Sequence, residues 1–178
     1  RRTGSIMING EETMQCAPHH IARLGVGYCP EHRGIFSSLS VQENLTLPPV
    51  VRSGGMSLEE IYNMFPNLYE RRFSQGTKLS GGEQQMLAMA RILRTGANVL
   101  LLDEITEGLA PVIVKQIGTL IDELAATTTI LFTDQSVHFA LKHANRAYIL
   151  EKGRVVHEAD AAKLRADTAT QNRFLSVA

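Results

Sequence analysis

One short segment, NVLLLDE, restricts the fold of this chain more than any other part of its sequence. Four apolar residues, Val99 to Leu102, run without interruption into Asp103 and Glu104. An uninterrupted apolar run of this length is typical of a parallel strand that is buried on both faces. A helical pattern that begins at Pro111 follows, and then a second apolar run, TTTILFTDQ, at 127–135. This strand–helix–strand order predicts an α/β fold with a mostly parallel sheet.

The two carboxylates at the end of the first run indicate a binding site. Burying adjacent anions costs several kcal/mol each unless something compensates them. In open parallel sheets, ligands bind at the carboxyl ends of the strands. Asp103 would hold Mg²⁺, mostly through water, and Glu104 would orient or deprotonate an attacking water. The alternative is a strand that simply meets solvent, with its carboxylates capping the loop.

The stretch KLSGGEQQ places two glycines where a long helix begins. Ser80 and Glu83 form a capping box, which accounts for both of these residues. Gly81 and Gly82 weaken a helix start by about 1 kcal/mol each relative to alanine. Bare backbone N–H groups at a helix N-terminus bind anions, and a residue without Cβ lets a phosphate approach them. The alternative is a loop-to-helix junction that needs only a flexible turn.

The remaining elements suggest one domain with a helical insertion. Residues 1–39 and 96–178 alternate strands and helices and form the expected α/β core. Residues 40–95 contain three expected helices, two of which begin at capping boxes like that of Ser80, at Ser40 and Ser57. Hairpins are expected at Asn9-Gly10 and Lys152-Gly153, and the segments DAAKLRA and NRFLSVA are expected to form short helices.

The composition excludes several classes of function. The 178 residues are 44% apolar, enough for one domain with a real core. Eighteen basic residues balance eighteen acidic ones, so no basic excess indicates a nucleic-acid surface. No apolar run reaches the roughly 18 residues of a membrane span, and the opening RRTGSIMING lacks the apolar region of a signal peptide. Cys16 and Cys29 form no metal or redox motif, which favours a reducing cytoplasm.

Taken together, the motifs resemble those of the ATP-binding-cassette (ABC) ATPases. LSGGEQQ, a helix and NVLLLDE follow one another like that family's signature motif and Walker B strand. GVGYCPEHRGIFSSLSVQENL resembles the loop that enters its helical subdomain, ITEGLAP its D-loop and FTDQS its switch loop. The resemblance covers nearly the whole chain and implies a P-loop NTPase-like fold. PEHRGIFSSLSVQENL, YERR, GLAP and DQ are most similar to branched-chain amino-acid importer ATPases, and a urea or amide importer ATPase would look similar.

The resemblance also implies roles for individual residues. In this family, two ATP molecules lie between two nucleotide-binding domains, and each contacts the phosphate loop of one and the signature motif of the other. By resemblance, Ser80, Gly81 and Gly82 contact the γ-phosphate of an ATP held by the opposite subunit. They are therefore expected to complete a site to which another chain contributes the phosphate loop.

Four further residues receive catalytic or ligand-binding roles from the same resemblance. Asp103 is expected to serve Mg²⁺, Glu104 the hydrolytic water and Glu31 the γ-phosphate, while Gln135 occupies the position of the family's switch residue. Residues 108–111 are expected at the dimer interface.

The chain departs from the family pattern at several places: the phosphate loop, Glu31, Gln135 in place of a switch histidine, and Ile105 in place of a common proline. No G-x-x-x-x-G-K-[ST] phosphate loop occurs in the 178 residues, so the resemblance implies a truncated nucleotide-binding domain that neither binds nor hydrolyses ATP appreciably alone. Glu31 stands where most relatives have glutamine. A carboxylate still coordinates Mg²⁺, but a surface ion pair between Glu31 and Arg33 is an equal alternative.

These observations lead to two expected functions of different kinds. The first is the ATP-hydrolysing subunit of an ABC importer, which pairs with a second ATPase subunit and with transmembrane permease subunits. It would lie on the cytoplasmic face of the membrane without inserting into it. The second is a non-catalytic interaction module that offers its signature motif to a partner bearing a phosphate loop.

Overall fold

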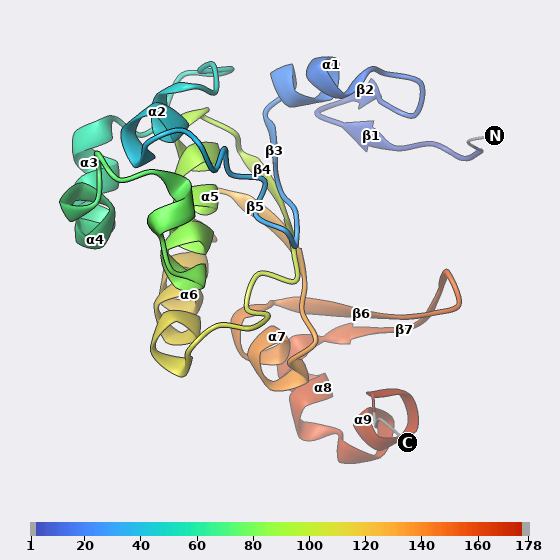
Figure 1. The fold of residues 1–178 in the computed structure, drawn as a ribbon. Helices are drawn as coiled ribbons and strands as arrows, with labels where there is room; N and C mark the ends of the chain where they lie inside the picture. The colour runs from blue at the N-terminus through green and yellow to red at the C-terminus, as the bar shows by residue number, and fades with distance from the viewer. Residues whose placement is uncertain (1–2, 176–178) are drawn as a thin grey trace.

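The computed structural model describes residues 3–175 of the chain (Figure 1). Its helices are α1 (Pro18–Arg23), α2 (Val41–Thr46), α3 (Leu58–Met64), α4 (Pro66–Glu70), α5 (Gly81–Arg94), α6 (Pro111–Leu124), α7 (Val137–His143), α8 (Ala161–Ala166) and α9 (Thr168–Leu175), with a 3₁₀ turn, η1, at Gly76–Lys78. Its strands are β1 (Met7–Ile8), β2 (Glu11–Glu12), β3 (Val26–Cys29), β4 (Val99–Asp103), β5 (Thr129–Thr133), β6 (Arg146–Glu151) and β7 (Arg154–Asp160).

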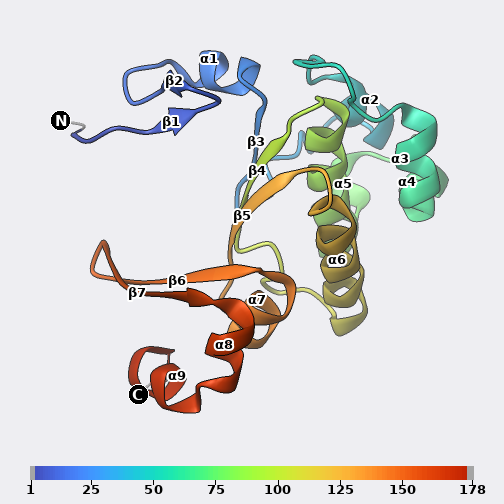
Figure 2. The same ribbon diagram turned by 180° about the vertical axis from the view of Figure 1, so that it is seen from behind.

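The two apolar runs form strands β4 and β5 of one parallel sheet, as predicted, and the observed strand order is β3–β4–β5. Figures 1 and 2 show α5 and α6 along one face of this sheet, where Leu100 and Leu102 are buried in the main core. On the opposite face, Tyr28 and Leu131 remain 56% and 59% exposed. The expectation that β4 is covered on both faces is therefore wrong for residues 3–175, because helices pack against one face only.

The segment between β3 and β4 contains the helices α2 to α5. Three of them begin at the predicted capping boxes, at Ser40, Ser57 and Ser80, where each serine accepts from the backbone three residues ahead and the glutamate there accepts in return. Buried side chains of α2, α3, α4 and α5 share one core with the sheet. The sequence did not predict α4, which has five residues, starts at Pro66 and lacks a side-chain cap.

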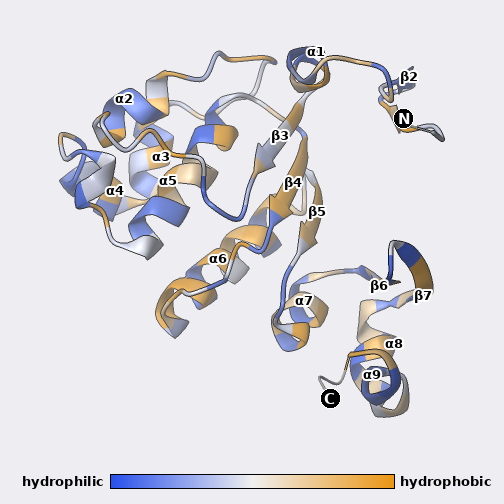
Figure 3. Cartoon of the chain, turned by 45° about the vertical axis from the view of Figure 1, so that its right-hand side comes forward, coloured by the Kyte–Doolittle hydropathy of each residue, from blue (hydrophilic) through white to orange (hydrophobic). Residues whose placement is uncertain are grey.

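The C-terminal part forms a smaller unit around an antiparallel hairpin. Strands β6 and β7 turn at Lys152-Gly153, as predicted, and pack with α7, α8 and α9 around a second buried cluster. The first four residues of the expected last helix, NRFLSVA, belong to α9, which begins earlier, at Thr168. The last three residues of NRFLSVA lie outside the described residues. Figure 3 shows many apolar residues on β4, β5 and α6.

Near the N-terminus, β1 and β2 form the short hairpin expected at Asn9-Gly10, with both turn residues at positive φ. None of the helices within residues 3–175 has the length and apolar character needed to cross a membrane.

Candidate nucleotide site

Asp103 lies at the carboxyl end of β4, where two neighbouring strands hold its side chain. Its Oδ1 accepts a hydrogen bond of 2.7 Å from the Thr133 hydroxyl of β5. Its Oδ2 accepts a longer one, of 3.4 Å, from the Tyr28 hydroxyl of β3. Burial and the nearby Asp103 charge raise the pKa of Tyr28, so this hydroxyl stays protonated as a donor at neutral pH. The carboxylate is therefore oriented by donors on both sides.

Glu104 follows in a strained backbone conformation. Its φ is +45°, in the left-handed region that costs non-glycine residues on the order of 1 kcal/mol. Two hydrogen bonds hold this conformation, because the Glu104 N–H donates to the Thr133 carbonyl at 3.1 Å and to its hydroxyl at 3.2 Å. A turn follows directly after β4, in which the Glu107 N–H donates to the Glu104 carbonyl at 3.2 Å. Gln135 then donates from Nε2 to Glu104 Oε2 at 2.6 Å.

Three carboxylates meet beside this turn. Oxygen atoms of Glu31, Glu104 and Glu107 lie within 4.8 Å of one another. A side-chain hydrogen bond with Glu104 raises the pKa of Glu107, and desolvation and the charges of Glu104 and Glu31 act in the same direction. The group thus concentrates negative charge that a cation would neutralise. Asp103 does not belong to this group of three, and the sequence did not predict Glu107 as a member.

The loop after β5 is joined to the loop after β4 by side-chain hydrogen bonds from three consecutive residues. Thr133 bonds to Asp103 and Gln135 to Glu104, as described, and Asp134 accepts from the Thr106 hydroxyl at 2.7 Å. Parallel strands end at the same edge of a sheet, so such contacts follow from the order β4–β5. The residues predicted to position water and to act as a switch are therefore in direct contact.

The signature residues lie at the start of α5, on a different element. Ser80 caps the helix and leaves Gly81 and Gly82 in its first turn. A Cβ added to Gly82 would lie 2.9 Å from Ile113 Cγ1 of α6, whereas one added to Gly81 would meet only the Arg33 guanidinium, at 3.4 Å. The packing against Ile113 therefore gives a second reason for a glycine at position 82, which the sequence did not reveal. At Gly81, only the flexible Arg33 side chain lies close to where a ligand would approach the backbone.

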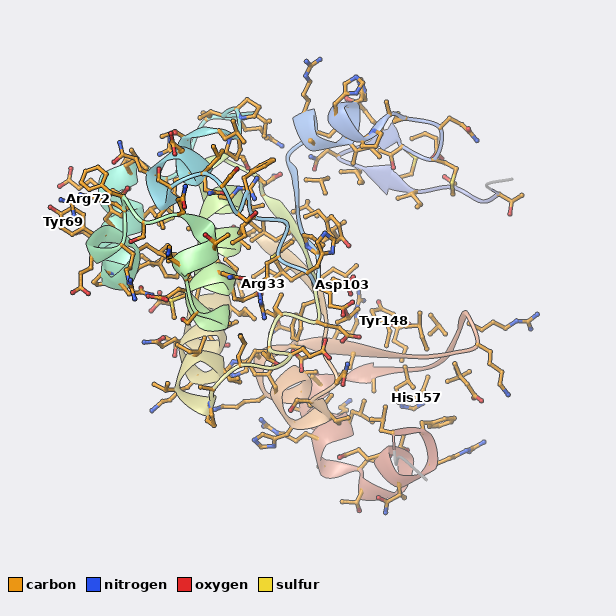
Figure 4. The ribbon with its side chains drawn as sticks, in the orientation of Figure 1. Arg33, Tyr69, Arg72, Asp103, Tyr148 and His157 are labelled. Carbon is orange, nitrogen blue, oxygen red and sulfur yellow. The ribbon has the colours of Figure 1, made fainter. Side chains whose placement is uncertain are left out.

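Arg33 adds a positive charge beside this helix start. It comes from the loop after β3, has a φ of +65° and donates from Nη1 to Gln84 Oε1 at 3.2 Å. Its Nε is buried without a hydrogen-bond partner. In the part of the chain that the structure describes, no ion pair joins it to Glu31, so the surface-pair alternative is not what forms. Figure 4 shows Arg33 beside α5 and Asp103 at the end of the sheet.

The chemical groups of these residues fit the expected Mg²⁺ ion and phosphate. Carboxylate oxygens and water are the ligands that Mg²⁺ prefers. Glu31, Glu104 and Glu107 bring carboxylate oxygens within 4.8 Å of one another, and Asp103 lies outside this group at the end of β4. Backbone N–H groups that no side chain bonds, together with a nearby guanidinium, suit a phosphate. At the start of α5, Gly81 supplies such an N–H and Arg33 the guanidinium. Asp103, Glu104, Glu31 and Gln135 surround the strand ends, while the signature residues occupy the helix start.

Comparison with known proteins identifies the family. The profile of the ABC transporter family matches residues 1–107. The chain is 40% identical over 167 residues to the high-affinity branched-chain amino acid transport ATP-binding protein BraG of Pseudomonas aeruginosa, covering 91% of this chain and 72% of that protein. It is 37% identical to the probable branched-chain amino acid transport ATP-binding protein LivF of Archaeoglobus fulgidus, with 91% and 71% covered. The lipopolysaccharide export system ATP-binding protein LptB of Escherichia coli is 31% identical, with 98% and 75% covered.

Solved structures share the fold. A dimeric post-hydrolysis state of an ATP-binding cassette bound to ADP and Pi superposes with a TM-score of 0.77 at 23% identity, covering 89% of this chain and 74% of that one. A nucleotide-free ATP-binding cassette superposes with a TM-score of 0.78 at 16% identity, covering 98% and 76%. The chain therefore belongs to the ABC transporter family and is, by family, a nucleotide-binding ATPase cassette.

Proposed function

We propose that this chain works in the ATP-hydrolysing subunit of an ABC importer for branched-chain amino acids. The observation that carries the proposal is the contact of Glu104 with Gln135 beside Asp103, on a sheet edge separate from the half-buried helix start at Gly81. One chain thus offers two half-sites, one for hydrolysis and one for binding the phosphate of a neighbour. The higher identity to BraG and LivF than to LptB supports an amino-acid importer over a lipopolysaccharide export system.

Each half-site has a defined task in this proposal. Asp103 would hold Mg²⁺, mostly through water, and Glu31 would lie beside it; the ion supplies charge neutralisation on the phosphate oxygens. Glu104 would orient and deprotonate the attacking water. Gln135, which fixes the Glu104 carboxylate, has a second amide N–H with which to bond a γ-phosphate.

The signature half-site binds the γ-phosphate of an ATP held by the opposite subunit. Gly81 and Gly82 present backbone N–H groups at the positive end of the α5 dipole. Ser80, whose N–H already donates to the Glu83 carboxylate at 2.7 Å, would contribute its hydroxyl. Side chains crowd the backbone least at Gly81, where the nearest atoms to an added Cβ belong to Arg33. Residues 108–111, at the start of α6, would lie at the dimer interface. The four α2–α5 helices, within residues 40–95, would form the signature subdomain and the rest the α/β core.

In this proposal the protein is cytoplasmic and reaches the membrane through permease subunits. Closure of two ATPase subunits around ATP would reshape the permease, and hydrolysis would reset it. Neither nucleic acid nor direct membrane insertion has a part in it.

A second candidate is a non-catalytic module that lends its signature motif to a partner. It is favoured by one observation, the capped helix start within LSGGE, where Ser80 caps α5 and the nearest atoms to a Cβ added at Gly81 belong to Arg33. The two candidates differ in which residues matter for hydrolysis. In the first, both Glu104 and Gly81 are needed; in the second, only Gly81 is.

The test uses the complex of this chain with its proposed ATPase and permease partners, purified through an affinity tag on this chain; it is called the tagged complex. ATP hydrolysis is measured for the unaltered complex, for Glu104→Gln and for Gly81→Ala. The first candidate predicts that Glu104→Gln lowers the rate by about 100-fold or more, the usual contribution of a general base. An unchanged rate in Glu104→Gln with a loss in Gly81→Ala supports the second candidate, and a complex without ATPase activity refutes the first.

A further inference from the structure

The hydroxyl of Thr133 contacts both acidic residues at the end of β4. It donates to Asp103 Oδ1 at 2.7 Å and accepts from the Glu104 N–H at 3.2 Å. A hydroxyl has one proton to donate and two lone pairs, so these two bonds are compatible. One group thus orients the side chain of Asp103 and supports the backbone of Glu104.

The position of this hydroxyl is well determined. Thr133 is the last residue of β5 and pairs in register with Asp103, so the two side chains leave the sheet side by side. A β-branched side chain in a strand has restricted rotation about χ1, which fixes the direction of its oxygen. Replacing threonine with valine would keep the shape and remove only the hydroxyl.

The two hydrogen bonds of the Thr133 hydroxyl differ in whether another group could replace them. The Glu104 N–H has a second acceptor, the Thr133 carbonyl at 3.1 Å, which any residue at this position would offer. The Asp103 carboxylate has one other donor, Tyr28, at the longer distance of 3.4 Å. The hydroxyl is therefore the strongest constraint on the direction of the Asp103 carboxylate, and a hydrogen bond to an ionised acceptor is shorter and stronger than a neutral one.

We propose that Thr133 is a positioning residue that aligns the Asp103 carboxylate for its cation. The proposal rests on the proposed function, in which Asp103 serves Mg²⁺. A carboxylate offers about four lone-pair sites. Thr133 occupies one on Oδ1 and Tyr28 one on Oδ2, so the remaining lone pairs stay available to a cation or its water. The hydroxyl thereby fixes Asp103 before the ion arrives, which spares the entropy of ordering that side chain on binding.

The first test needs no nucleotide and uses the 178-residue chain. Three variants are compared by NMR couplings that report the χ1 angle of Asp103: Thr133→Val, Thr133→Ser and the control Thr129→Val, which removes an exposed hydroxyl from the other end of β5. We expect one Asp103 rotamer in the unaltered chain, in Thr133→Ser and in the control, and averaged couplings in Thr133→Val. A single rotamer in Thr133→Val overturns the proposal.

The second test measures the Mg²⁺ dependence of ATP hydrolysis by the tagged complex. Loss of a hydrogen bond to a charged group predicts an apparent Mg²⁺ constant about tenfold higher in Thr133→Val, with Thr133→Ser close to the unaltered complex. An unchanged constant overturns the proposal. An Asp103→Asn complex that hydrolyses ATP normally refutes the assigned role of Asp103 instead, so failure of the proposed function is recognised separately.

Discussion

Adjacent glycines at the start of α5 are expected to respond in opposite ways to the same substitution. In Gly82→Ala, the new Cβ lies 2.9 Å from Ile113 Cγ1 and 3.4 Å from two further carbons of the same side chain. Overpacking of this kind costs about 1–3 kcal/mol, and alanine regains up to about 1 kcal/mol of helix propensity. The net loss of about 1 kcal/mol would lower the Tm of a chain of this size by about 2–4 °C.

Gly81→Ala is expected to do the reverse. Its Cβ meets only guanidinium atoms of Arg33, at 3.4 Å and beyond, and the glycine has no positive φ to preserve. Gly→Ala changes at compatible sites stabilise by about 0.4–1 kcal/mol. The same methyl group covers the backbone N–H groups proposed to bind phosphate. Gly81→Ala should therefore keep or raise the Tm while ATP hydrolysis by the tagged complex falls.

Calorimetric or circular-dichroism melting of both variants measures these effects. The control is Ile113→Ala, which removes the carbons that a Gly82 side chain would meet. In that background Gly82→Ala should cost less than in the unaltered chain, giving a coupling free energy of about 1 kcal/mol in a double-mutant cycle. Equal Tm shifts for the two glycine variants, or no coupling to Ile113, would refute the packing explanation.

Three further predictions concern other parts of the chain. Burial raises the pKa of the Cys29 thiol to about 11, so a maleimide at neutral pH should label Cys16 in the folded chain and Cys29 only after denaturation. Hydrogen bonds within the capping boxes lower the pKa of Glu43 and Glu60 below 4.5; the stability they add is present above pH 4.5 and lost as the pH falls through the lowered values, so replacing both with glutamine should flatten the acid limb of a Tm–pH curve. Isothermal calorimetry of the 178-residue chain alone should detect no micromolar MgATP binding, whereas such binding would contradict the role expected for the G-x-x-x-x-G-K-[ST] motif.

Local sequence patterns predicted the elements whose cause is local. The capping boxes at Ser40, Ser57 and Ser80 depend on residues three apart, and each formed as expected. The apolar run of β4 correctly predicted a parallel strand, although helices cover only one of its faces within residues 3–175. The short α4 was missed because Pro66 permits a helix start but no capping side chain marks it.

The candidate site was predictable only in part, because several of its contacts depend on how loops return. Glu107 lies near Glu104 and Glu31 through a turn in which its N–H donates to the Glu104 carbonyl, and no spacing in the sequence shows that conformation. The three-residue separation of Glu104 and Glu107 was the only available signal. Thr133 likewise becomes a partner of Asp103 through the pairing of β4 with β5, which sequence motifs alone do not report.

The sequence explained only part of why a glycine occupies position 82. A phosphate-binding helix start explains why a glycine is useful there, but the contact with Ile113 depends on the packing of α5 against α6. Sequence reasoning has access to the first cause and not to the second.

The most direct test of the central claim is the ATPase rate of the tagged complex carrying Glu104→Gln, measured beside the unaltered complex at saturating MgATP. The claim that this chain supplies both a hydrolytic and a signature half-site predicts a fall of about 100-fold or more. A rate within about twofold of the unaltered complex would contradict it and would leave the chain with the signature role alone.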